Sequence, residues 1–117
     1  MSAEEIKEFC RRFYEALDAG DAETASALFP DGTIIHLWDG RTFHTQAEFR
    51  AWFRELRSTS EDAKREIERL EVDGNQAKVE VILHANRDGE KKVVRLTHEF
   101  LFEGDRLVEV TVAIRPL

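Results

Sequence analysis

Three short glycine-containing turns divide the second half of the chain into four long segments. The turns are DGN at 73–75, RDG at 87–89 and EGD at 103–105, and each has the composition of a tight β-hairpin turn. The segments between and beside them are rich in β-branched and alternating apolar residues. We therefore predict four consecutive antiparallel strands at about 63–73, 76–87, 91–103 and 106–115.

The first of these strands has a break in its alternation. Arg65 and Ile67 share one face of a regular strand, whereas Leu70 and Val72 share the other. A β-bulge near 68–69 reconciles the two halves and also bends the sheet.

The first half of the chain predicts three helices and a short hairpin. Ser2 with Glu5 and Thr45 with Glu48 are capping boxes, and Asp21 is a third helix cap. The predicted elements are helices from Ser2 to Gly20, at 22–29 and at 46–57, and strands at 33–38 and 41–44 around a DG turn. The order α-α-β-β-α-β-β-β-β predicts an α+β fold, and 117 residues predict a single domain, 1–117.

Composition excludes several classes of function. A formal net charge of -7 without a basic stripe argues against nucleic-acid binding, and the apolar runs are too short to span a membrane. The single cysteine, Cys10, allows no internal disulfide and no cysteine-based zinc site. Glu4 and Glu5 occupy the place of a signal peptide's basic region, so we expect a cytoplasmic protein when it is produced recombinantly.

His98 is the first candidate for chemistry. It shares a strand face with Val94, Leu96, Phe100 and Phe102, so its imidazole is predicted to point into the core. A histidine there either satisfies one hydrogen bond in the core or serves a pocket.

Three further polar residues are candidates because of where they fall. Tyr14 and Asp18, with Cys10, form a stripe along one edge of the first helix. The Tyr14 phenol could meet His98 and form a hydrogen bond that moves a proton near neutral pH. An inward Arg65 needs a partner, and Asp18 is the expected one. The alternatives stay open: a packed aromatic for Tyr14, and solvated charges for Asp18 and Arg65.

The element order and two stretches resemble the NTF2-like, or cystatin-like, superfamily. The stretches are RRFYEALDAGDAETASALF at 11–29 and IIHLWDG at 34–40. The resemblance implies a cone in which three helices pack in a strongly curved, mixed or antiparallel six-stranded sheet around a cavity.

A closer resemblance runs along nearly the whole chain, to the de novo designed luciferases of the LuxSit type. The matching stretches are RRFYEALD, HLWDG, the REI and LEV of 65–72, the TH of 97–98 and the final IRP. This resemblance implies oxidation of a synthetic imidazopyrazinone, diphenylterazine, by O2 with light emission. No metal or cofactor is implied, because the substrate carries the chemistry. The implied partner is this small molecule, with no nucleic acid or membrane, and the implied state is a monomer or weak homodimer.

The same resemblance implies roles for particular residues. The implied catalytic residues are Tyr14 with His98, and Asp18 with Arg65. Some related designs carry an arginine where Ser60 stands, which leaves Arg65 as the main cation and Arg57 as a substitute. The expected substrate-binding residues are Phe13, Leu17, Ile35, Leu37, Phe49, Trp52, Phe53, Leu56, Ser60, Val81, Leu83, Leu96, Val110 and Val112.

Two other functions fit the same fold. Natural NTF2-like enzymes of the ketosteroid isomerase and polyketide cyclase types use an inward Asp or His as a base, a role open to Asp18 or His98. A binding scaffold with a pocket and no catalysis is the third possibility.

Overall fold

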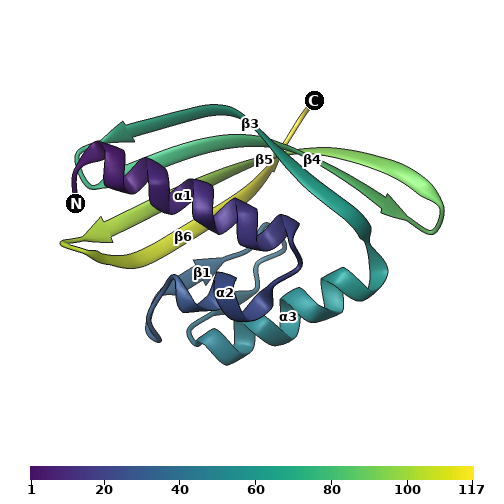
Figure 1. Cartoon of the computed structure of the whole chain (residues 1–117), viewed down its shortest axis with the longest axis horizontal. Coiled ribbons are helices and arrows are strands. Elements are labelled where there is room, and N and C mark those ends of the chain that lie inside the picture. The colour runs from purple at the N-terminus through teal and green to yellow at the C-terminus, as the bar shows by residue number, and fades with distance from the viewer.

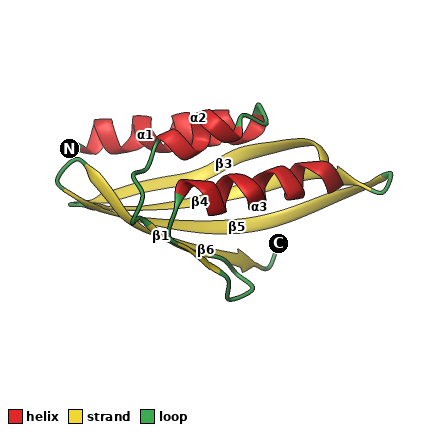
Figure 2. Ribbon diagram, turned by 90° about the horizontal axis from the view of Figure 1, so that it is seen from below, coloured by secondary structure: helices red, strands yellow, loops and turns green.

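A computed structural model describes the backbone of residues 1–117 and the side chains of residues 1–60 and 62–117. Three helices cover one face of a six-stranded curved sheet (Figures 1 and 2). This arrangement confirms the predicted α+β cone. The elements are α1 (Ala3–Asp18), α2 (Ala22–Ala27), β1 (Ile34–His36), β2 (Thr42–Phe43), α3 (Gln46–Thr59), β3 (Glu61–Asp73), β4 (Gln76–Arg87), β5 (Glu90–Glu103) and β6 (Arg106–Arg115).

The sheet is mixed, with strand order β2-β1-β6-β5-β4-β3. The long strands β3 to β6 pair antiparallel with their neighbours in sequence, as the three hairpin turns predict. The short strand β1 pairs parallel with β6 and antiparallel with β2. The β1–β2 hairpin therefore extends the sheet on the side opposite β3.

Helix caps set where the helices begin. Ser2 and Glu5 form the predicted capping box at α1, and the Asp21 side chain accepts a hydrogen bond from the Thr24 N–H at α2. The Thr45 hydroxyl accepts from the Glu48 N–H at α3. The buried residues of the three helices then face the concave side of the sheet.

Element ends differ from the predictions at the weaker signals. Helix α2 ends at Ala27, because Leu28 forms its C-cap, and α3 continues to Thr59. Strand β1 ends at His36, because the Leu37 N–H donates to the Arg41 carbonyl and closes the turn there.

Two bulges inside the long hairpins shape the sheet, and a further register shift lies between Glu61 and Lys64 at the start of β3. The β3–β4 register shifts between Ile67 and Arg69, which confirms the bulge predicted near 68–69. A second shift, which the alternation did not predict, lies where Leu101 pairs with Glu109 and Phe102 pairs with Leu107. It turns both Leu107 and Val110 inward, and each is 3% exposed.

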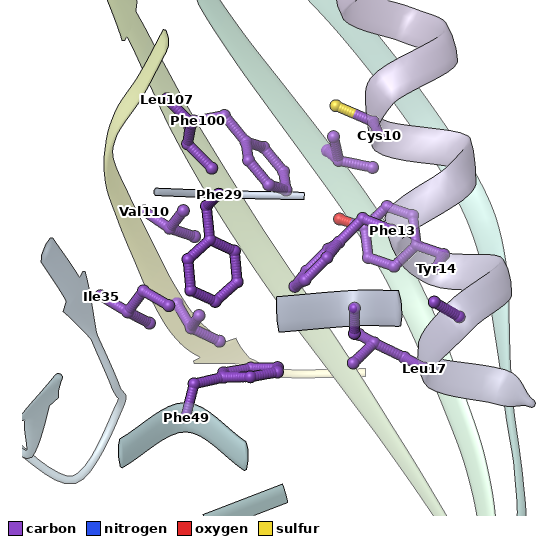
Figure 3. Packing of buried hydrophobic residues seen from close by; sticks show 14 of the residues in the cluster. Cys10, Phe13, Tyr14, Leu17, Phe29, Ile35, Phe49, Phe100, Leu107 and Val110 are labelled. Carbon is purple, nitrogen blue, oxygen red and sulfur yellow. The ribbon is translucent and has the colours of Figure 1, made fainter. Parts of the chain in front are cut away.

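Aromatic side chains from all three helical segments meet inside the curve. Phe13 of α1 and Phe29, just after α2, each lie near Phe49 of α3, with ring centroids 6.3 and 5.2 Å from it (Figure 3). Phe100 of β5 packs edge-on to Phe13 at 6.0 Å. An apolar cavity lies beside this aromatic core, between α3, α1 and the sheet.

Candidate small-molecule site

An apolar cavity of about 60 Å³ lies between the helices and the concave face of the sheet. Arg65 and His98 are the charged or titratable members of its wall among the residues with described side chains. The other lining residues are Phe13, Leu17, Phe29, Ile35, Leu37, Trp38, Phe49, Trp52, Phe53, Leu56, Leu83, Leu96, Leu107, Val110 and Val112. An apolar wall with few polar groups is typical of small-molecule sites.

Two tryptophans lie at the rim of this cavity. Trp38, in the β1–β2 turn, is 42% exposed, and its ring lies edge-on to that of Trp52 on α3 at 6.2 Å. A cavity of about 60 Å³ is much smaller than the roughly 300–1,000 Å³ of typical ligand pockets. A ligand with several rings therefore requires these side chains to move apart.

His98 points into the core, as the strand pattern predicts. Its side chain is part of the cavity wall and the residue is 5% exposed. Burial, with a smaller contribution from the nearby charge of Arg65, lowers the pKa of His98 from 6.5 to about 3. The imidazole is therefore neutral at physiological pH, and the expected proton transfer near neutrality is not available to the unliganded protein. A bound anion would raise this pKa, because an opposite charge favours the imidazolium.

Tyr14 lies beside His98, but the predicted hydrogen bond between them is absent. The ring centroids are 5.4 Å apart and the planes are nearly perpendicular, which directs an edge of one ring at the face of the other. Neither the Tyr14 hydroxyl nor His98 Nδ1 has a hydrogen-bond partner among the described residues. Burial raises the pKa of Tyr14 well above its ordinary value, so the phenol stays protonated. Tyr14 is outside the set of described residues that line the cavity, and it lies behind His98 on α1.

Asp18 and Arg65 form the predicted ion pair. Arg65 Nη1 donates to Asp18 Oδ1 at 2.9 Å, and the Arg65 backbone N–H donates to both carboxylate oxygens at 3.1 and 3.2 Å. The Arg65 side chain is 7% exposed and the Asp18 side chain 22%. Burial lowers the pKa of Arg65, and the bonds to Asp18 partly offset this. Arg65 belongs to the cavity wall, whereas Asp18 lies behind it, outside the described lining residues.

Twelve of the fourteen expected substrate-binding residues line the cavity, and Ser60 and Val81 do not. Ser60 is the half-buried C-cap of α3, whose N–H donates to the Leu56 carbonyl, so it lies beyond the helix end. Val81 faces inward on β4 but is completely enclosed by core side chains.

Three lining residues were not predicted from the sequence: Phe29, Trp38 and Leu107. A regular strand over the expected range 33–38 would place Trp38 on the outer face, opposite Ile35 and Leu37, but β1 ends at His36 and the turn brings Trp38 to the rim. Leu107 lies out of phase with Val110, and only the second bulge turns it inward. His36, which has the parity of Trp38, lies on the outer face, where its Nε2 atom is 3.2 Å from Glu109 Oε2.

No group of three or more His, Cys, Asp or Glu side chains in the described part of the chain is arranged to hold a metal ion. The described helices include none that is both long enough and apolar enough to cross a membrane.

The lowered pKa of His98 predicts a specific pH dependence of stability. Below pH 6.5 the unfolded chain binds a proton at His98, whereas the folded protein does not until about pH 3. The free energy of unfolding should therefore fall as the pH is lowered, by about 2 kcal/mol from pH 7 to pH 5 for this residue alone. Urea unfolding of wild type and His98→Gln at both pH values measures the difference. His84→Gln, at a half-exposed histidine, should keep the wild-type dependence, and an identical slope in His98→Gln would contradict the assignment.

A second prediction concerns the Tyr14 hydroxyl. Because it is buried with no partner in the described structure, Tyr14→Phe should leave the melting temperature unchanged or raise it. Tyr14→Leu, which also removes the ring contacts with Phe13 and His98, should lower it clearly. If Tyr14→Phe instead lowered the free energy of unfolding by more than about 1 kcal/mol, the prediction would be wrong, because the hydroxyl would then make a hydrogen bond in solution.

Comparison with known proteins places this architecture in a family. Residues 10–110 match the SnoaL-like domain family. The chain belongs to the SnoaL-like family. No curated protein matches it in sequence.

Solved structures support this placement of the SnoaL-like chain at the level of the fold. An NTF2-like protein of unknown function from Burkholderia pseudomallei K96243 has a TM-score of 0.86 at 19% identity, covering 98% of this chain and 92% of that one. A candidate SnoaL-like polyketide cyclase from Shewanella denitrificans OS-217 has a TM-score of 0.83 at 12% identity, covering 93% and 89%. A protein of ketosteroid isomerase-like fold from Catenulispora acidiphila DSM 44928, in complex with trimethylamine, has a TM-score of 0.82 at 13% identity, covering 90% and 83%. At these identities the likeness concerns the fold, so the function of this SnoaL-like domain has to be argued from its cavity.

Proposed function

We propose that this protein is a luciferase that oxidises diphenylterazine, a synthetic imidazopyrazinone, with O2 and emits light without a cofactor. One observation carries the proposal: His98 and an ion-paired Arg65 are the titratable or charged groups on the wall of an otherwise apolar cavity, among the side chains described. The sequence resemblance to designed luciferases of this type, which includes Tyr14, Asp18, Arg65 and His98, supports the same function.

The cavity suits a substrate that must react as an anion. The Arg65 guanidinium stabilises negative charge on the bound ring, and Asp18 holds it in place by accepting one hydrogen bond from Nη1 and two from the Arg65 backbone N–H. Charge stabilisation is stronger in a dry site than in water, because little solvent screens it. The substrate anion then reacts with O2.

His98 serves this reaction as a neutral hydrogen-bonding group in the resting protein. With a pKa of about 3 it does not store a proton at neutral pH before the substrate binds. Once a substrate anion lies beside it, the imidazolium form becomes more favourable, so His98 can accept the substrate proton as the anion forms. Tyr14, edge-on to the imidazole, restricts the ring's orientation.

The apolar walls have a separate task after the oxidation. The aromatic side chains of Phe13, Phe49, Trp52 and Phe53 enclose the rings of the product and exclude water from it. A rigid, dry environment favours emission over loss of energy as heat. Because the resting cavity is small, we expect the Trp38 and Trp52 rim to open for binding and to close over the bound molecule.

Mixing purified protein with diphenylterazine in air-saturated buffer, without any additive, tests the proposal. Light well above that from the heat-unfolded protein, and its loss after removal of O2, are the expected results. Emission no greater than that of the unfolded sample would contradict the luciferase proposal.

A second candidate is acid–base catalysis of the isomerase or cyclase type. Family membership and the free Nδ1 of a neutral His98 on the cavity wall favour it. In this case His98 abstracts a carbon-bound proton and Arg65 stabilises the resulting enolate. Conversion of a β,γ-unsaturated ketone in the absence of O2 would distinguish this activity from the luciferase reaction.

A further inference from the structure

Four apolar side chains form a continuous patch on the concave face of the sheet beside the cavity. Leu83 of β4 pairs with Val94 of β5, and Leu96 of β5 pairs with Ile114 of β6. Val94 and Leu96 are two residues apart on the same strand, so all four side chains lie on one face of the sheet. We call these four residues the sheet platform.

One half of the sheet platform belongs to the cavity and the other half is accessible to solvent. Leu83 and Leu96 line the cavity, whereas Val94 is half-buried and Ile114 is 48% exposed. The β4–β5 hairpin projects beyond the end of α3 in both views of the fold (Figures 1 and 2). The apolar wall of the cavity therefore continues without interruption onto an open part of the concave face.

The rim residue Trp38 extends this apolar surface on the side of β1. Strand β1 runs parallel to β6, with His36 opposite Thr111. Beyond this pair the two segments continue toward the same end of the sheet, one to Trp38 and the other to Ile114. Exposed apolar side chains that gather beside a pocket are typical of a binding surface.

The size of the cavity indicates what this surface binds. A cavity of about 150 Å³ accommodates one benzene ring, and the cavity here has a volume of about 60 Å³. One ring therefore fills the enclosed space once the tryptophan rim has opened, and a ring attached to it has to lie outside. The continuous apolar surface that it meets there is the exposed half of the sheet platform.

We propose that the sheet platform is a second aryl-binding subsite, which selects elongated ligands with one ring enclosed and another lying against Val94 and Ile114. The inference rests on the proposed function only in taking the cavity as the ligand site. Ile114 contacts the outer ring and is remote from the charged groups of the cavity wall, so it is a specificity-determining residue and not a catalytic one.

Two neutral probes test the inference: benzyl alcohol, which has one ring, and biphenyl-4-methanol, which has two. Chemical-shift titrations measure their dissociation constants. Wild-type protein should bind the two-ring probe about tenfold more tightly, because its outer ring leaves water for the platform. Ile114→Thr, which keeps the β-branch that suits a strand, should weaken binding of the two-ring probe about fivefold and leave benzyl alcohol unchanged. Ile114→Phe should tighten binding of the two-ring probe, because it enlarges the apolar surface.

Ile67→Thr is the matched control for Ile114→Thr. Ile67 lies at the other end of the same cross-strand row, which runs through Val81 and Leu96 to Ile114. It is 37% exposed and lies on the edge strand β3, outside the described lining of the cavity. This variant should keep the wild-type affinity for both probes, and circular dichroism verifies that each variant is folded.

Four results would overturn the inference: equal affinity of wild type for the two probes, no binding of either, a wild-type affinity ratio in folded Ile114→Thr, or an equal loss in Ile67→Thr. Sedimentation at the protein concentration of the titrations tests a different occupant of the platform. A wild-type dimer that Ile114→Thr converts to a monomer would also overturn the inference, because a second copy of the chain would then cover the platform. None of these measurements involves light or O2, so their outcome is separate from that of the luciferase assay.

Discussion

Replacing His98 with alanine should lower light emission from diphenylterazine by about 100-fold while the protein remains folded. His98 belongs to the cavity wall, and positioned acid–base groups typically contribute at least this factor. The loss should appear mainly in the maximal emission rate rather than in the substrate concentration at half-maximal emission. Initial light intensity across a substrate titration, with circular dichroism to verify the fold, measures both.

His84→Ala is the matched control for this experiment. His84 lies on the neighbouring strand β4, is half-exposed and contacts Glu66 at 3.6 Å, away from the cavity wall as described. It should emit as wild type does. Emission by folded His98→Ala within a factor of two or three of wild type would refute the role proposed for the imidazole.

Asp18→Ala should destabilise the fold strongly, by about 3 kcal/mol in the free energy of unfolding. The substitution leaves the Arg65 guanidinium, 7% exposed, without its carboxylate and removes both acceptors of the Arg65 backbone N–H. An ion left unpaired in a protein interior costs much more than the net contribution of the pair. Urea unfolding monitored by tryptophan fluorescence measures the change.

Asp18→Ala combined with Arg65→Met provides the decisive comparison. Methionine fills a similar volume without a charge, so the double variant should recover a large part of the lost stability. Glu90→Ala, which breaks an exposed pair with Lys92, should change stability little. If Asp18→Ala unfolds like Glu90→Ala, the pair is effectively solvated and cannot act as a fixed charge for the substrate.

The long hairpins were predictable from the sequence because their signals are local. The glycines at 74, 89 and 104 all adopt positive φ, and the strands that they join begin and end within two residues of the predicted positions. The inward direction of His98 follows from the same alternation, since its strand is regular from Val94 to Phe100. Local turn chemistry and a period of two are sufficient for these features.

Residues beside an irregularity were not predictable in the same way. Leu107 faces inward because of a bulge whose only sequence signal is a mismatch with Val110, and Trp38 reaches the cavity rim from a turn. At such positions the pairing of distant strands decides the direction of a side chain, and alternation within one segment cannot report it.

Whether a polar contact could be predicted from the sequence depended on how many orientations its two side chains can adopt. The Asp18–Arg65 pair was predictable because a buried guanidinium requires an acceptor, and the carboxylate on the adjacent helix end can reach it. The hydrogen bond expected between Tyr14 and His98 requires the phenol oxygen and an imidazole nitrogen to lie about 3 Å apart, with both rings turned to align the bond. The rings are neighbours, but packing holds them edge to face instead. Sequence spacing predicts proximity and does not predict orientation.

The bulge in β3 bends the sheet without changing which side chains of the strand face the interior. The extra residue near Glu68 lies opposite no partner on β4, while Ile67 and Arg69 on either side keep theirs. Deleting it would make the β3–β4 ladder regular from Lys64 to Asp73, with Arg65 and Leu70 still directed at the helices, but the strand would be flatter. The width of the hollow beneath the helices can therefore be adjusted by the length of a strand, without changing any side chain that lines it.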